Sequence, residues 1–106
     1  MAKYLVRANY VGDGVAGLVR DGGSKRRAAV EKLFGAVGGR VEAFYYAFGD
    51  TDLFVIGDLP DNASAAALSL AVNATGAVNI NITVLMTAEE MDTAAKRAPG
   101  YTAPGH

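Results

Sequence analysis

The stretch Val78-Asn79-Ile80-Asn81-Ile82-Thr83-Val84 decides the fold of this chain, because apolar β-branched residues alternate there with uncharged polar ones. Successive side chains of a strand point to opposite faces, so the pattern predicts a strand with one face in the core. The other face carries Asn79, Asn81 and Thr83. That polar face would be wet, line a cavity or meet a partner.

A similar alternation over residues 3–10 predicts a first strand, with Tyr4, Val6 and Ala8 on one face and Lys3, Arg7 and Asn9 on the other. The remaining predicted elements are strands at 40–48, 53–59 and 77–86, and helices at 24–37, 60–74 and 88–97. Residues between Gly12 and Gly23 give no clear pattern.

Turn and capping residues separate these elements. Ser24 is a candidate N-cap for the first helix, and Gly38-Gly39 ends that helix. Gly49-Asp50-Thr51-Asp52 predicts the tight turn of a hairpin, whose register is ambiguous by one residue. Thr87 and Glu90 have the spacing of a capping box.

The element order β-α-β-β-α-β predicts an α+β, ferredoxin-like fold. In it, a four-stranded antiparallel sheet carries two helices on one face, with the fourth strand beside the first and a short C-terminal helix added. We expect one domain over residues 1–97 and a flexible tail over residues 98–106.

Composition limits the function classes. The hydrophobic fraction of 51% suffices for a core, and the formal net charge of -1 gives no general attraction for nucleic acid or membranes. The chain has no cysteine, and its one histidine, His106, lies in the predicted tail. We therefore expect no metal site and no cofactor. The N-terminus lacks the pattern of a signal peptide, which predicts a cytoplasmic protein.

Several separated motifs resemble those of the GYD domain family of small bacterial proteins. They are Asn9-Tyr10-Val11-Gly12-Asp13-Gly14, Ala43-Phe44-Tyr45, Gly49-Asp50-Thr51-Asp52, Gly76-Ala77-Val78 and Thr87-Ala88-Glu89-Glu90. Thr51 stands where the family usually has tyrosine, and Asn79 where a basic residue is common. The resemblance implies a ferredoxin-like fold of the dimeric α/β-barrel kind and no established activity.

The polar sheet face is the leading candidate site. We predict that a small organic or anionic ligand lies over Arg7, Asn9, Asn81 and Thr83, with Tyr46 as an apolar wall. Strict alternation along residues 40–48 would put five side chains on this face: Arg40, Glu42, Phe44, Tyr46 and Phe48. With Leu5 and Leu85 exposed there too, the face predicts a homodimer or larger assembly.

Two other segments leave alternatives open. Lys25, Arg26 and Arg27 follow a glycine turn at a predicted helix start, where they are either solvated or placed to bind an anion. The helix within residues 63–72 is uncharged on all sides. This reflects either an alanine-rich composition or contact with another subunit.

Two functions follow from these observations. The first is a non-catalytic oligomeric module that binds a small ligand or a partner across the sheet face. The alternative is a cofactor-independent dimeric-barrel enzyme, an isomerase or monooxygenase, using Arg7, Glu42 and Tyr46. Convergence of a carboxylate and a hydrogen-bond donor in one pocket would favour the enzyme.

Overall fold

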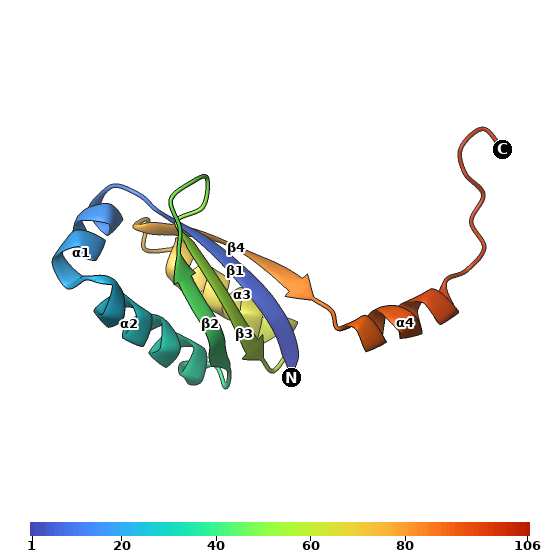
Figure 1. The fold of residues 1–106 in the computed structure, drawn as a ribbon, viewed down its shortest axis with the longest axis horizontal. Helices are drawn as coiled ribbons and strands as arrows, with labels where there is room; N and C mark the ends of the chain where they lie inside the picture. Colours follow the sequence, from blue (N-terminus) through green and yellow to red (C-terminus); the bar gives the residue numbers. More distant parts are fainter.

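Four antiparallel strands form one open sheet in the order β2-β3-β1-β4 (Figure 1). They are β1 (Ala2–Tyr10), β2 (Arg40–Tyr46), β3 (Leu53–Leu59) and β4 (Val78–Leu85). The computed structural model describes all 106 residues. The predicted hairpin is confirmed as the β2–β3 pair, and β4 lies beside β1 as expected.

Helices cover only one face of this sheet. The helices are α1 (Asp13–Asp21), α2 (Gly23–Ala36), α3 (Asn62–Asn73) and α4 (Ala88–Arg97). Phe34 of α2 and Leu68 of α3 pack into one core with inward side chains of β1, so both helices lie on the same side. The predicted α+β, ferredoxin-like arrangement is confirmed.

The core follows the predicted alternation of β1. Tyr4, Val6 and Ala8 are buried against α2 and α3, while Arg7 is exposed on the opposite face. We call this uncovered side, which carries Leu5 and Arg7, the bare face. The register of the hairpin is also settled, because Val55 is 1% exposed in the core and Phe54 lies opposite Arg7 on the bare face.

One expectation for β2 is wrong. A β-bulge between Val41 and Ala43 shifts the pairing with β3, and an extra residue at a bulge reverses the faces of the residues beyond it. Phe44 therefore packs against the core, and Tyr46 also lies on the helix side. Tyr45 takes the bare-face position, opposite Phe54.

The segment between Gly12 and Gly23 also differs from expectation. It contains α1, whose Leu18 packs against the core although Gly14 and Gly17 weaken its helix propensity. Gly22, with φ at 79°, separates α1 from α2 and occupies the N-cap position that we expected Ser24 to fill. Packing of Leu18 against the core outweighs the low helix propensity of the two glycines.

The other helix ends are also capped, and two of these caps, the capping box of α4 and the glycine stop after α2, were predicted. Asp61 accepts a hydrogen bond from the Ser64 N–H at 2.8 Å at the start of α3. Thr87 and Glu90 form both bonds of a capping box at the start of α4. Gly38, with φ at 83°, follows the end of α2.

The C-terminal helix lies apart from the rest of the molecule. Figure 1 shows α4 and the following tail extending away from the sheet, and no residue of α4 is buried. Met91 on this helix is 56% exposed. Isolated helices of about ten residues are marginal in water, so α4 lacks the packing that normally stabilises such a helix.

Candidate functional site

The bare face brings together most of the predicted site residues. Arg7 pairs with Asn81 across β1 and β4, Leu5 pairs with Thr83, and Asn9 pairs with Asn79. Arg7, Asn81 and Thr83 are exposed, and Arg7 forms no ion pair within the chain. A donor-rich guanidinium therefore stands beside uncharged hydrogen-bonding groups, as predicted for the row on these two strands.

Tyr46 does not belong to this row. Its hydroxyl donates to the Gly23 carbonyl at 3.0 Å, and its ring meets Phe44 edge to face with centroids 5.2 Å apart. Both contacts are on the helix side, as the β-bulge requires. The prediction that Tyr46 forms a wall beside Arg7 is therefore wrong for the single chain.

Asn9 has a structural partner. Its side-chain oxygen accepts from the Asp52 N–H at 3.1 Å, and the Asp52 carboxylate accepts from the Tyr10 N–H at 3.0 Å. These two bonds tie the β2–β3 loop to the end of β1. The side chain of Asp52 therefore bonds to another strand and not to its own turn.

Replacing Asp52 by alanine should lower the free energy of unfolding by about 1 kcal/mol, because the Tyr10 N–H loses its acceptor. Urea unfolding followed by circular dichroism measures this loss. Asp50→Ala, in an exposed part of the same loop, is the matched control and should change little. Equal stability of the Asp52→Ala variant and the parent would contradict a structural role.

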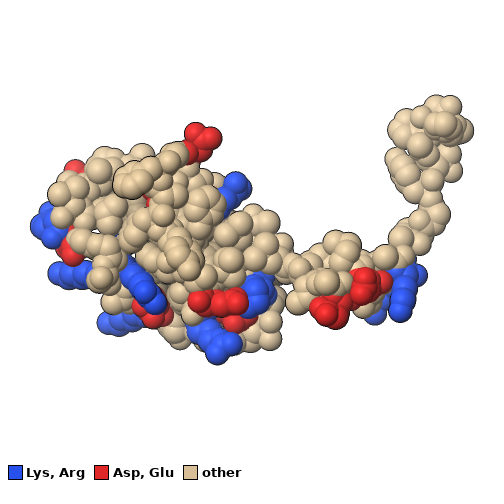
Figure 2. All heavy atoms as spheres, in the orientation of Figure 1, with Lys and Arg blue, Asp and Glu red and all other residues tan.

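A charged cluster occupies the end of the bare face near the N-terminus (Figure 2). Lys3 pairs with Glu42 and donates to Asp58 at 3.1 Å, and Arg40 donates to Asp58 at 3.2 Å. The Lys3 ammonium, aided by Arg40, holds the pKa of the Asp58 carboxyl below its ordinary value, although burial opposes this effect. The carboxylates raise the pKa of Lys3.

This charged cluster also bears on the enzyme alternative. Glu42 is engaged by Lys3, while Tyr46 lies on the other side of the sheet. Arg7, Glu42 and Tyr46 therefore do not converge within one chain. A pocket combining a carboxylate with a hydrogen-bond donor, which would have favoured catalysis, is not assembled from these three residues.

Apolar side chains fill the remaining area of the bare face. The register places Ile56 beside Leu5, Phe54 beside Arg7, and Tyr45 beside Phe54. Tyr45 is 72% exposed and Phe54 is 37% exposed. Leu85, opposite Lys3, is half-buried on the same side. The face is thus mixed, with a charged end, an apolar middle and a polar row on β1 and β4.

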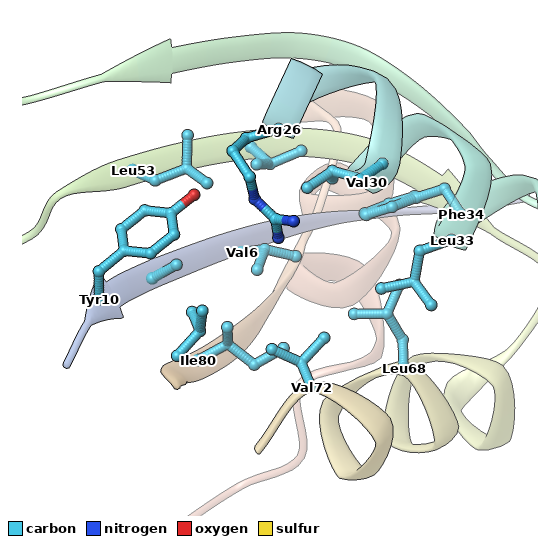
Figure 3. A pocket seen from close by; sticks show the side chains of 14 residues that line it. Val6, Tyr10, Arg26, Val30, Leu33, Phe34, Leu53, Leu68, Val72 and Ile80 are labelled. Carbon is cyan, nitrogen blue, oxygen red and sulfur yellow. The ribbon is translucent and has the colours of Figure 1, made fainter. Parts of the chain in front are cut away.

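A second candidate site lies on the helix side. The sequence prediction included Arg26 among three cations at a helix start, but it missed the apolar cavity that Arg26 lines. A partly open cavity of about 90 Å³ lies between the sheet, α2 and α3. Thirteen of its 14 lining residues are hydrophobic, and the remaining one is Arg26. Figure 3 shows the Arg26 side chain extending from α2 into this space, with the Tyr10 hydroxyl pointing toward it.

The sequence did contain a signal for this placement. Arg26 precedes Val30 by four residues and Phe34 by eight, so it lies on the same stripe of α2 as these apolar residues. The neighbouring cations are paired with carboxylates instead. Lys25 Nζ lies 3.8 Å from Asp21 Oδ1, and Arg27 Nε lies 3.4 Å from Glu31 Oε1. The three successive cations therefore do not form one patch.

A wider hollow adjoins this cavity at Tyr10. It has a volume of about 430 Å³, and Leu18, Tyr46 and Asp52 are among its lining residues. Burial raises the pKa of Tyr46 to about 12, and the adjacent Tyr10 adds to the increase, whereas Arg26 opposes it. The Tyr46 phenol therefore keeps its proton, and its hydrogen bond to the Gly23 carbonyl, to a higher pH than an ordinary tyrosine would.

The raised pKa of Tyr46 predicts a loss of stability in alkali. The folded state favours the protonated phenol of Tyr46. The contribution of this phenol to the free energy of unfolding is therefore complete below pH 10 and is lost as the pH rises toward about 12. Free energies of unfolding below pH 10 and near pH 12 should differ less in Tyr46→Phe than in the parent. Tyr45→Phe, altered on an exposed side chain, should behave like the parent.

These features define a class of protein: a small α+β domain with one sheet face covered by helices and the other face bare. No helix has both the length and the apolar character needed to span a membrane. No group of three or more side chains is arranged to hold a metal ion.

Comparison with known proteins identifies the family. The model of the GYD domain matches residues 4–95, and the chain belongs to this family. No curated protein and no solved structure matches the chain. The match runs from β1 into α4, so the resemblance seen in the sequence is confirmed over nearly the whole chain.

Proposed function

We propose that the protein is a small, non-catalytic binding module that works as a homodimer, with the bare face of each chain packed against that of the other. The observation that carries this proposal is the set of apolar side chains on an uncovered sheet. Leu5, Phe54 and Ile56 are neighbours on the two central strands, and Tyr45 extends the patch onto β2. Soluble monomers rarely leave a large continuous apolar patch in water.

A second copy suits this surface because the face is chemically mixed. Its end holds both signs of charge, with Lys3 and Arg40 beside Glu42 and Asp58. In a two-fold interface each patch meets the same patch of the other chain, so a surface carrying both signs can complement itself. Two sheets packed face to face would bury the apolar middle in the same way as a sandwich core.

The projecting helix α4 supports the same proposal. From strand spacing and rise, the footprint of a four-stranded sheet of this length is about 500 Å², whereas stable interfaces cover about 800 Å² per partner. An amphipathic helix such as α4, with Met91 exposed, could supply the missing area by packing on the second chain. Such packing would also provide the support that α4 lacks within its own chain.

The predicted ligand row would lie at the edge of this interface. Arg7 has no acidic partner in its own chain, and Asn81 and Thr83 offer donors and acceptors beside it. In the proposed dimer, Arg7 meets either a small anionic ligand or a carboxylate of the second chain. Asn9 contributes less to ligand binding in this proposal, because its side-chain oxygen already accepts a hydrogen bond from the Asp52 N–H.

Sedimentation velocity at micromolar concentration tests the dimer. The parent should sediment with twice the chain mass of 11.0 kDa, whereas Phe54→Asp should sediment as a monomer. The reason is that the variant places a charge in the apolar middle of the bare face, where it would be desolvated without a partner. A parent that is monomeric and remains soluble would overturn the proposal.

A matched control distinguishes this interface from one built on α3. Leu70 of α3 is 72% exposed on the outside of the helix layer, so Leu70→Asp also places a charge on an exposed apolar residue. The proposal requires Leu70→Asp to remain dimeric. Dissociation of Leu70→Asp with an intact Phe54→Asp dimer would assign the interface to α3 instead.

A further inference from the structure

We propose that the cavity between α2, α3 and the sheet binds a small organic anion, with its apolar group among the core side chains and its acidic group on Arg26. This site is on the opposite side of the sheet from the bare face. The proposal of this ligand site therefore does not depend on the proposed homodimer.

The first argument is that the Arg26 side chain is half-buried and has no acidic partner. Its guanidinium extends into a largely apolar space (Figure 3), yet it forms no ion pair within the chain. Asp13 and Asp21 line a neighbouring hollow that Arg26 also lines, but neither forms an ion pair with Arg26, and Asp21 Oδ1 already lies 3.8 Å from Lys25 Nζ. A half-buried cation without a carboxylate is complementary to an anion supplied from outside.

The second argument is the apolar cavity below Arg26. Val6, Ala8 and Ile80 line its floor on β1 and β4, and Val30 and Leu68 line its sides on α2 and α3. Apolar cavities of about 150 Å³ in proteins accept benzene. A partly open cavity of about 90 Å³ can accept a ring edge or a short aliphatic chain whose acidic end remains at the mouth.

The chemistry of the mouth selects for negative charge. The cavity lining contains Arg26 and no acidic residue, and the only other polar atom shown there is the Tyr10 hydroxyl. Arg26 lies in the first turn of α2, which starts at Gly23, so the helix dipole acts in the same direction as its charge. A carboxylate would gain charge-assisted hydrogen bonds here, while an ammonium group would be repelled.

Benzoate and benzamide, which share a ring and differ in charge, are the probes for this site. Titration of each into the 15N-labelled protein should shift the backbone amides of Ala8, Arg26, Val30 and Ile80 in NMR spectra. We expect benzoate to bind about tenfold more tightly than benzamide, as for one charge-assisted hydrogen bond at a half-buried site. In Arg26→Gln this preference should disappear, and in Arg26→Lys it should be partly retained.

Two further variants complete the test, and the same spectra show whether each variant is folded. Arg27→Gln, next in sequence but paired with Glu31, should keep the full preference for benzoate. Val30→Phe should weaken the binding of both benzoate and benzamide, because the larger side chain fills the cavity. The proposal is overturned if neither probe shifts the cavity amides, if the parent binds both equally, or if Arg27→Gln acts like Arg26→Gln. It is also overturned if Arg26→Gln binds benzoate as tightly as the parent does.

Discussion

Replacing Phe34 by alanine should lower the free energy of unfolding by about 3–5 kcal/mol, the usual range for a buried phenylalanine. Phe34 is 1% exposed and joins α2 to the sheet at the centre of the core. It also lines the cavity beneath Arg26, so the space it leaves would merge with an existing hollow. Urea unfolding followed by circular dichroism would measure the loss.

The control for this prediction is an aromatic residue outside the core. Tyr101 lies in the C-terminal segment and is 83% exposed, so Tyr101→Ala should unfold at nearly the same urea concentration as the parent. A Phe34→Ala variant that loses less than about 1 kcal/mol would mean that α2 does not depend on this side chain for docking.

Gly57→Ala should cost about 1–3 kcal/mol, as expected when atoms are forced into a packed core. Gly57 lies on β3 directly beneath Phe34. A Cβ atom there would stand 2.5 Å from the Phe34 ring and 2.8 Å from the Arg40 carbonyl oxygen. Because one obstacle is a buried ring and the other is backbone, both would have to move. Thermal and urea unfolding would show the loss.

A double variant tests the cause of that loss. The loss in the double variant Gly57→Ala with Phe34→Leu should be smaller than the sum of the two single losses, because a smaller side chain at position 34 relieves the closer of the two contacts. Gly35→Ala is the matched control. Nothing lies within 4 Å of the added methyl in that helix, so the variant should be as stable as the parent or more so. Additive losses in the double variant would contradict the proposed contact.

The parts of the fold that the sequence predicted depend on local patterns. The alternation in β1 and β4 predicts which side chains point to the helix side, because a period of two leaves one choice of face once the apolar set is known. It does not predict burial at the end of β4, where Val84 is 56% exposed. The capping box at Thr87 and the helix stop at Gly38 depend on a few neighbouring residues, and both were predicted. The adjacency of Arg7 and Asn81 followed from the topology that these elements imply.

The predictions that were wrong concern features that depend on contacts between segments far apart in the sequence. The faces of β2 depend on a bulge opposite β3, and no local pattern marks where two residues will oppose one. Tyr46 was therefore placed beside Arg7, although it bonds to Gly23 on the other side of the sheet. Similarly, α1 contains two glycines that disfavour a helix, but its Leu18 packs against the core.

The sequence by itself determined the family, the α+β fold and the polar row on β1 and β4, because these follow from periodicity and short motifs. Only the tertiary structure decided which aromatic residues share a face with Arg7 and that Arg26 opens onto an apolar cavity. The physical reason is that a bulge and a cavity are properties of how elements fit together. A strand's register depends on its partner, and the space beneath Arg26 depends on how α2 and α3 pack on the sheet.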